Sequence, residues 1–273
     1  MKITKILLIS LLVPLAVLYC LTALSPRLSN RTSAPVITCD TPVLEVSVTD
    51  DASAYLAGVT ATDAQDGDIS REILIQGISK FISEDTAKIT YIVFDSDGNL
   101  ASVSRQLRFT DYTSPRFEIV QPLRYVAGSS IALLDRLRVT DAIDGDITDD
   151  IRVSPLTATS EAEIYSVDLQ ITNSLGDTSR ITLPVVVTSG NASRPVVNLS
   201  KYLVYLNTGD HFTAGQYLHS VTSTDGSSTT DDVTIIGTVD TATPGTYLVY
   251  YRCSDSFGTG TAVLTVIVEG GAA

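Results

Sequence analysis

One segment of this chain occurs three times. A proline followed by an alternating apolar stretch appears at Pro35 (PVIT), Pro115 (PRFEI) and Pro195 (PVVNL), with successive copies 80 residues apart. A fixed period of this kind indicates a structural unit that is repeated in tandem along the chain. The question of the fold therefore reduces to the fold of one unit.

An acidic motif lies near the middle of the first two copies. It reads TDAQDGDI at Thr62–Ile69 and TDAIDGDI at Thr140–Ile147. The third copy keeps only Thr224, Asp225 and Gly226, followed by SSTTDD. Asp-Gly pairs are typical of tight turns, so the motif predicts the same turn in two of the three copies.

A later strand also recurs and ends in a polar turn with glycine. The three versions are ITYIVFDSDG, VDLQITNSLG and VYYRCSDSFG. One residue in two is apolar, which is the period of a half-buried strand. The inward positions predicted by this alternation are Ile89, Tyr91, Val93, Val167, Leu169, Ile171, Val249, Tyr251 and Cys253.

Short strands separated by turn signals, in units of this length, are typical of an antiparallel β-sandwich. We therefore predict an all-β protein with three tandem immunoglobulin-like sandwiches after one N-terminal transmembrane helix. The expected segments are a membrane anchor or signal peptide at 1–24, a stalk linker at 25–34, and immunoglobulin-like domains at 35–113, 114–193 and 194–273.

The combined pattern, Pro-Val-Ile, then Thr-Asp-x-x-Asp-Gly-Asp-Ile, then Tyr-x-x-x-Asp-x-x-Gly, resembles the bacterial immunoglobulin-like repeats first named from a pesticidal crystal protein, which are similar in style to hyalin repeats. The resemblance covers Pro35 to about Glu269 and is weakest in the third copy, which lacks the Asp-Gly-Asp. It implies a bacterial, extracellular display protein and does not imply an enzyme, since a fold alone does not fix a function.

The N-terminal segment has the features of a membrane anchor. Lys2 and Lys5 precede an uncharged run, Ile6–Leu24, that would span about 28 Å as a helix. Positive charge before the run favours a cytoplasmic N-terminus with the remainder outside. A cleaved signal peptide is the alternative, although Pro26 stands where it would hinder cleavage after Ser25.

Charge and cysteine content narrow the partners and the compartment. The formal net charge is −13, which makes nucleic acid an unfavourable partner. Cys20 lies in the apolar run, and Cys39 and Cys253 lie in different copies, so no domain has its own disulfide. An exported chain without disulfides indicates a bacterial envelope. We expect a single-pass cell-membrane protein with extracellular C-terminal domains.

The acidic turns allow two interpretations. Carboxylates gathered on a turn are the hard oxygen ligands that Ca²⁺ prefers, but aspartates also accept backbone N–H groups and fix turns without a metal. No other cofactor is expected. The candidate calcium ligands are Asp63, Asp66, Asp68, Asp141, Asp144 and Asp146.

Tyrosines are concentrated in the third copy, where Tyr202 and Tyr250 are candidate contacts to a partner. Ordinary strand packing is the alternative for such tyrosines. Catalysis has little support. The two histidines, His211 and His219, lie in a polar stretch without a nucleophile motif, so we predict that the chain is not an enzyme.

These observations predict a membrane-anchored, extracellular stalk or adhesion module that contacts an unknown surface protein or glycan. The alternative is an accessory carbohydrate-binding or scaffold module of a cell-envelope enzyme system.

The N-terminal interpretation has a direct test. We expect N-terminal sequencing of the mature, membrane-extracted protein to begin within the first few residues, because no favourable cleavage site follows the apolar run. A mature start between Ser25 and Ser33 would show instead that the run is a signal peptide.

Overall fold

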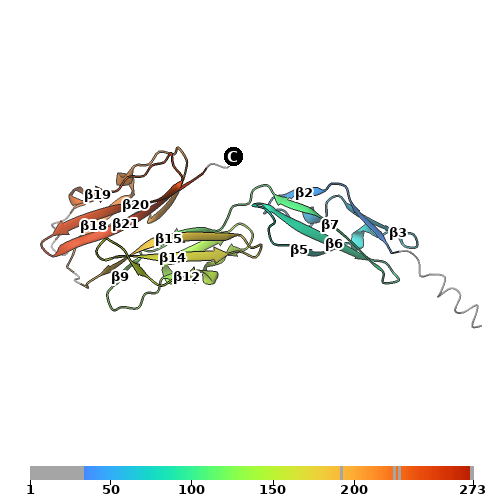
Figure 1. The fold of residues 1–273 in the computed structure, drawn as a ribbon, viewed down its shortest axis with the longest axis horizontal. Helices are drawn as coiled ribbons and strands as arrows, with labels where there is room; N and C mark the ends of the chain where they lie inside the picture. Colours follow the sequence, from blue (N-terminus) through green and yellow to red (C-terminus); the bar gives the residue numbers. More distant parts are fainter. Residues whose placement is uncertain (1–33, 191–192, 224–225, 227–228, 271–273) are drawn as a thin grey trace, which may run out of the picture. The chain divides into compact units, whose positions relative to one another are not determined.

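The computed structural model describes residues 34–190, 193–223, 226 and 229–270 (Figure 1). Every regular element in this part of the chain is a β-strand or a short 3-10 turn, so the predicted all-β class is confirmed. The strands fall into three consecutive sets, and each set builds one smaller and one larger sheet.

The first set forms the sheets β1-β3-β4 and β2-β7-β6-β5. Its elements are β1 (Val36–Cys39), β2 (Val43–Val46), η1 (Ala54–Leu56), β3 (Val59–Asp63), β4 (Gly67–Asp68), η2 (Ser70–Glu72), β5 (Leu74–Ile78), β6 (Thr86–Phe94) and β7 (Leu100–Phe109).

The second set forms the sheets β11-β10-β8 and β12-β14-β15-β9, with β13 also on β14. Its elements are β8 (Arg116–Ile119), β9 (Arg124–Val126), η3 (Leu134–Arg136), β10 (Leu137–Asp141), β11 (Gly145–Asp146), η4 (Thr148–Asp150), β12 (Arg152–Val153), β13 (Thr157–Ala158), β14 (Ile164–Thr172) and β15 (Thr178–Thr188).

The third set forms the sheets β16-β18 and β17-β21-β20-β19. Its elements are β16 (Val196–Leu199), β17 (Leu203–Asn207), η5 (Ala214–Tyr217), β18 (Leu218–Thr222), η6 (Thr230–Asp232), β19 (Thr234–Ile236), β20 (Gly245–Asp255) and β21 (Gly258–Glu269).

The opening strand of each set changes sheets. β1 pairs antiparallel with β3 in the smaller sheet, and β2 then pairs parallel with the closing strand β7 in the larger one. The second and third sets repeat this arrangement with β9 on β15 and β17 on β21. A short kink between the two segments carries the chain across the core.

The core follows the predicted alternation. All nine inward positions predicted on the recurring strand are buried, among them Val93, Ile171 and Cys253, which occupy corresponding positions in the three copies. Cys253 therefore packs as a small hydrophobic side chain. In the second set, one hydrophobic cluster joins Phe117 and Val139 of the smaller sheet to Leu169 and Leu183 of the larger sheet, as in a sandwich.

The chain forms two compact units, divided after Tyr112. The first contains the first set of strands, and the second contains the second and third sets together. In the described part of the chain no sheet takes strands from two sets. The division between the second and third domains stays a prediction, because these two sets pack against each other within one unit.

Among the described residues, no helix has the length and apolar character needed to cross a membrane. The predicted anchor Ile6–Leu24 lies outside those residues.

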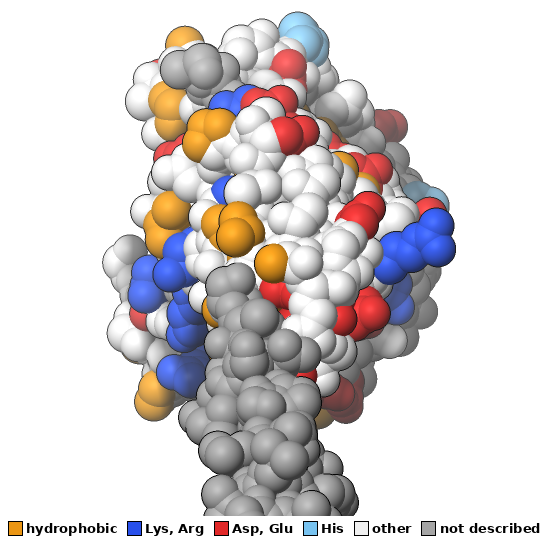
Figure 2. Space-filling model, turned by 90° about the vertical axis from the view of Figure 1, so that its right-hand side faces the viewer, with side chains coloured by type: hydrophobic (Ala, Val, Ile, Leu, Met, Phe, Trp, Pro, Cys, Tyr) orange, Lys and Arg blue, Asp and Glu red, His pale blue; other side chains and the backbone are white. Residues whose placement is uncertain are grey.

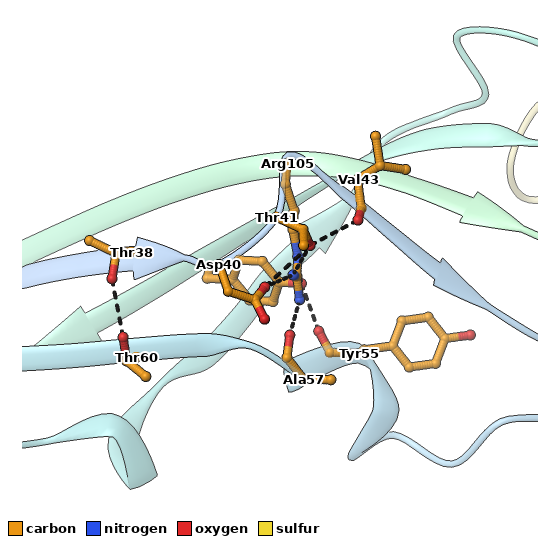
Figure 3. Close-up of polar contacts among 9 residues, drawn as sticks. Thr38, Asp40, Thr41, Val43, Tyr55, Ala57, Thr60 and Arg105 are labelled. Atoms are coloured by element: carbon orange, nitrogen blue, oxygen red, sulfur yellow. Dashed lines mark hydrogen bonds and ion pairs between the residues drawn. The ribbon is translucent and has the colours of Figure 1, made fainter.

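A buried arginine is the unusual feature of the first set (Figure 3). Arg105 of β7 lies opposite Ile89 and is 4% exposed, whereas the corresponding positions in the other two sets hold Leu183 and Leu264. Its Nε donates to Tyr91 Oη at 3.0 Å, one terminal nitrogen lies 3.4 Å from Asp40 Oδ1, and the other donates to the carbonyl oxygen of Ala57.

The tyrosine completes this network. Tyr91 donates its hydroxyl hydrogen to the carbonyl oxygen of Tyr55 at 2.6 Å. The guanidinium of Arg105 thus connects Asp40, in the kink after β1, with Ala57, in the segment after η1. Its hydrogen-bond partners all lie within the protein, as is usual for a buried polar group.

We expect Arg105→Ala to destabilise the first unit by on the order of 3 kcal/mol, because it opens a cavity and leaves the Ala57 carbonyl without a donor. Arg105→Leu should cost less, since leucine fills the volume, as it does in the other two sets. Hydrogen exchange of β6 and β7 peptides in the full chain measures both effects.

The control is Arg108→Ala, which removes an arginine that is 49% exposed and pairs with Glu45. It should change the stability by about 1 kcal/mol or less. Equal losses for Arg105→Ala and Arg108→Ala would contradict the structural role of Arg105.

Candidate functional site

The two acidic turns have the same geometry. Asp63 ends β3, and its Oδ1 accepts the N–H groups of Gln65 and Asp66 at 2.7 and 3.0 Å. Asp141 ends β10, and its Oδ1 accepts the N–H groups of Ile143 and Asp144 at 2.9 Å each. The side chain of the first aspartate therefore closes the turn that its own backbone begins.

The glycine of the motif is required by the backbone. Gly67 and Gly145 have φ values of 75° and 74°, a left-handed conformation that glycine adopts without a steric cost. This explains why Asp-Gly-Asp occurs in both turns.

The second aspartate of each motif ties the turn to the loop after the recurring strand. Asp66 accepts the N–H and the hydroxyl group of Ser96 at 2.8 and 2.7 Å. Asp144 binds Ser174 in the same way, at 2.6 and 2.7 Å. These contacts join the two sheets at one end of each sandwich.

The third aspartate starts the 3-10 turn that follows. Asp68 Oδ1 accepts the N–H of Ser70 at 2.9 Å, and Asp146 Oδ1 accepts the N–H of Thr148 at 3.1 Å. Side-chain hydrogen bonds from Ser70 and Thr148, followed by these backbone bonds, lower the pKa of Asp68 and of Asp146 below the ordinary value. The carboxylates are thus stabilised in the charged form as acceptors.

One carboxylate oxygen distinguishes the two turns. Asp141 Oδ2 accepts the side-chain amide of Asn173 at 3.1 Å. In the first set Asp95 stands at the position of Asn173, and the buried Oδ2 of Asp63 has no hydrogen-bond partner. An aspartate cannot donate in its charged form, so this exchange leaves the first turn with an unsatisfied acceptor.

Within the described ranges, no group of three or more His, Cys, Asp or Glu side chains is arranged as metal ligands. The hydrogen bonds above account for the roles of all six predicted aspartates as turn acceptors. Calcium binding by them stays a prediction.

The tyrosines predicted as partner contacts lie where the second and third sets meet. Tyr202 is half-buried, accepts the N–H of Leu199 at 3.1 Å and lies beside Leu123 and Pro184 of the second set. Tyr250 is also half-buried and packs on a small cluster formed by Ile164, Val186 and Val263. Their role in binding a partner stays a prediction.

A third tyrosine, Tyr205, also contacts the second set, although the sequence did not indicate it as a contact residue. Tyr205 Oη accepts the N–H of Phe117 at 3.3 Å, and the Arg116 guanidinium lies 5.0 Å from the centre of its ring. Burial raises the pKa of Tyr205 to about 12. Its position in β17 opposite β21 gave no sequence signal for a contact with another set.

Three ion pairs connect the same two sets. They join Arg116 with Glu269, Arg194 with Glu163, and Arg252 with Glu161. The Arg194 contact uses both oxygens of Glu163, at 2.8 and 2.7 Å, and Glu163 has a φ of 64°. A left-handed conformation costs energy for a residue other than glycine, so this ion pair accompanies a strained turn.

A cavity of about 440 Å³ lies in the same region. Residues 124–126, 129–130 and 136 of the second set line one side of it, and residues 194–196 and 259–261 line the other. Its volume is within the range of small-molecule sites. We refer to it as the joint cavity.

The remaining predicted residues have ordinary environments. His211 and His219 are exposed, as expected for a solvated polar stretch. Cys39 is half-buried and carries a free thiol whose pKa is raised by burial.

Parts of this chain are similar to known proteins. The family described as bacterial surface protein, Ig-like domain, matches residues 201–268. An uncharacterised 81.3 kDa protein of Acholeplasma phage L2 is 29% identical over 173 residues, which cover 61% of this chain and 22% of that protein. Pesticidal crystal protein Cry22Aa of Bacillus thuringiensis is 34% identical over 127 residues, which cover 45% and 17%. The chain thus matches only a small part of each relative.

Solved structures give weaker similarities. The lipoprotein BT2262 from Bacteroides thetaiotaomicron has a TM-score of 0.26 at 24% identity and matches 29% of this chain and 39% of its own. A Clostridium perfringens ZmpB structure with an M60 catalytic domain and two CBM51 domains has a TM-score of 0.24 at 12% identity, over 88% of this chain and 31% of its own. These scores are too low to support a conclusion about function.

The acidic turns can be tested in the second set, where both oxygens of Asp141 are used. We expect Asp141→Ala to cost about 2–3 kcal/mol, because it removes the acceptor of the Ile143 and Asp144 N–H groups and one acceptor of the buried amide of Asn173. Adding millimolar Ca²⁺ to the unchanged chain should not alter its melting temperature, because each of the six carboxylates already accepts at least one backbone N–H group.

Hydrogen exchange of β10 and β14 peptides and a calcium titration of the melting curve measure these effects. Asp149→Ala, at an exposed acidic position nearby, is the control and should change little. A melting temperature that rises with calcium, as linkage requires for a bound ligand, would overturn the turn-only interpretation.

Proposed function

We propose that this chain is a non-catalytic display protein of the bacterial cell surface, held in the membrane by Ile6–Leu24 with its immunoglobulin-like sandwiches outside the cell. The observation that carries the proposal is the match of residues 201–268 to an Ig-like domain of bacterial surface proteins. The repeated sandwich architecture and the absence of any expected disulfide pairing within a copy support the same environment.

The distribution of side chains on the surface supports a protein that faces solvent outside the cell. On the face shown in Figure 2, hydrophobic side chains form small groups among polar, acidic and basic ones. Scattered apolar residues are normal on a soluble surface. An acidic surface also suits a protein that must stay dispersed outside the cell.

Two interpretations of the display function differ in the partner. In the first, the chain is a stalk or adhesion module whose third sandwich contacts another surface protein or a glycan, with Tyr202 and Tyr250 contributing. In the second, it is an accessory carbohydrate-binding or scaffold module of a cell-envelope enzyme system. The joint cavity is large enough for a small-molecule ligand, and this supports the carbohydrate-binding alternative.

The display proposal predicts that protease added to intact cells removes residues 34–273, because these residues lie outside the membrane. Immunoblotting with an antibody to the third sandwich, before and after proteinase K treatment of cells that express the full chain, measures this. A cytoplasmic protein in the same cells is the control and should survive. Full protection of the third sandwich until the cells are lysed would rule out surface display.

A further inference from the structure

The joint cavity has a concentration of positive charge that is unusual for this protein. Three arginines line it, Arg124, Arg136 and Arg194, in a chain with a formal net charge of −13. Arginine is the cation best suited to bind carboxylate and phosphate groups, because its planar fork donates two parallel hydrogen bonds.

Only one of the three guanidinium groups is neutralised. Arg194 forms the two-point contact with Glu163. Arg136 donates to the carbonyl oxygens of Pro122 and Arg124. Arg124 donates to the Val197 carbonyl at 3.3 Å and to the side-chain carbonyl of Asn198 at 3.5 Å. Carbonyl oxygens satisfy hydrogen bonds without cancelling the charge. In the part of the chain that the structure describes, neither Arg124 nor Arg136 has a carboxylate within ion-pair distance.

The two uncompensated charges also affect each other. Burial is the main cause that lowers the pKa of Arg124; a hydrogen bond with the Tyr202 side chain opposes this shift, and the nearby Arg136 adds to it. A guanidinium carries five N–H donors, and the contacts of Arg124 and Arg136 do not use all five at either residue. Donors therefore remain for a ligand at both arginines.

The arginines are fixed in place before any ligand binds. The Arg136 guanidinium lies 4.2 Å from the centre of the Tyr125 ring and is clamped on the two carbonyl groups. Arg124 bridges from β9 to β16 of the other set. Such preorganisation lowers the entropy cost of binding.

Five serine and threonine residues also line the cavity, together with apolar side chains such as Val126 and Pro195, and this mixture suits a ligand that is itself rich in hydroxyl groups. The hydroxyl-bearing residues are Ser129, Ser130, Thr188, Thr259 and Thr261.

We propose that the joint cavity binds an acidic saccharide, with its anionic group, a carboxylate or a phosphate, on Arg124 and Arg136 and its hydroxyl groups against the serine and threonine side chains. This inference rests on the proposed surface function and gives it a ligand class. The partner would be an acidic glycan that reaches the outer face of the cell.

The test is isothermal titration of the detergent-purified full chain with four probes. Sodium D-glucuronate and sn-glycerol 3-phosphate carry the two anionic groups, and D-glucose and glycerol are their uncharged counterparts. We expect at least one anion to bind with a Kd of about 1 mM and the uncharged counterparts to bind at least tenfold more weakly. Which anion binds shows whether the natural ligand carries a carboxylate or a phosphate.

The sharpest variant adds charge without removing any interdomain contact. Ser130 is exposed and lines the cavity. Ser130→Glu places a carboxylate beside the arginines and should weaken anion binding at least tenfold, whereas the matched Ser130→Gln should bind as the unchanged chain does.

A second pair of variants removes charge. Arg124→Gln should weaken anion binding about tenfold, and Arg138→Gln, at a position with a 58% exposed side chain on the same sandwich, should not. If Arg124→Gln unfolds, the Ser130 pair still decides the outcome.

The proposal is overturned if neither anion binds more tightly than its uncharged counterpart, or if Ser130→Glu and Ser130→Gln bind equally well. Such a result leaves surface display intact, because protease accessibility on cells does not depend on the cavity. Loss of accessibility would remove the display proposal even if the purified chain bound an anion.

Discussion

The crossing of the opening strand from one sheet to the other is the constraint on which each sandwich depends. The strand pairs must break at the kink, and the backbone groups there need new partners inside the protein. One bond is the same in all three sets: the N–H groups of Asp40, Val120 and Ser200 donate to carbonyl groups just after a 3-10 turn or within it, at 2.9, 2.9 and 2.8 Å. The side chains that complete the kink differ. Arg105 reaches it from β7, Arg136 reaches it from η3, and Tyr202 lies on the kink itself. A fixed backbone requirement has thus been met by three unrelated side chains.

The use of different side chains at the same kink explains how far the sequence could predict the fold. The alternation of Val93, Ile171 and Cys253 with polar neighbours is a local signal, and it correctly predicted which face of the strand is buried. Arg105 was beyond that reasoning, because an arginine in a strand indicates a solvent-facing position unless its partners are known. Those partners, Ala57 and Asp40, come from other strands and turns, so only the folded chain brings them together.

The acidic turns and the tyrosines show that sequence patterns also do not reveal which groups contact each other at a candidate functional site. Sequence spacing placed Asp141, Asp144 and Asp146 on one turn, and this was correct, but it could not decide whether their oxygens face a metal ion or backbone N–H groups. In the turn the N–H groups of Ile143, Asp144 and Thr148 donate to these carboxylates, and calcium binding stays a prediction. Tyr202 and Tyr250 are predicted to contact an external partner, and that role stays a prediction. Their position against the second set follows from an interface that no local pattern encodes.

That interface also determines where positive charge is available in an acidic chain. Arg116, Arg194 and Arg252 each meet a glutamate across it, so their charges serve to hold the two sets together. Because exposed ion pairs contribute little individually, the tyrosines and the apolar cluster around Val263 must supply much of the stabilisation of the interface. Arg124 and Arg136 differ because their partners are neutral carbonyl groups, and the structure therefore maintains two positive charges beside a cavity at the cost of mutual repulsion. An arrangement that served packing alone would be more stable with apolar side chains or with a matching carboxylate. Bonding at the kink explains the position of Arg136 but leaves its charge without a counter-charge, and an anionic ligand is the component that would balance it.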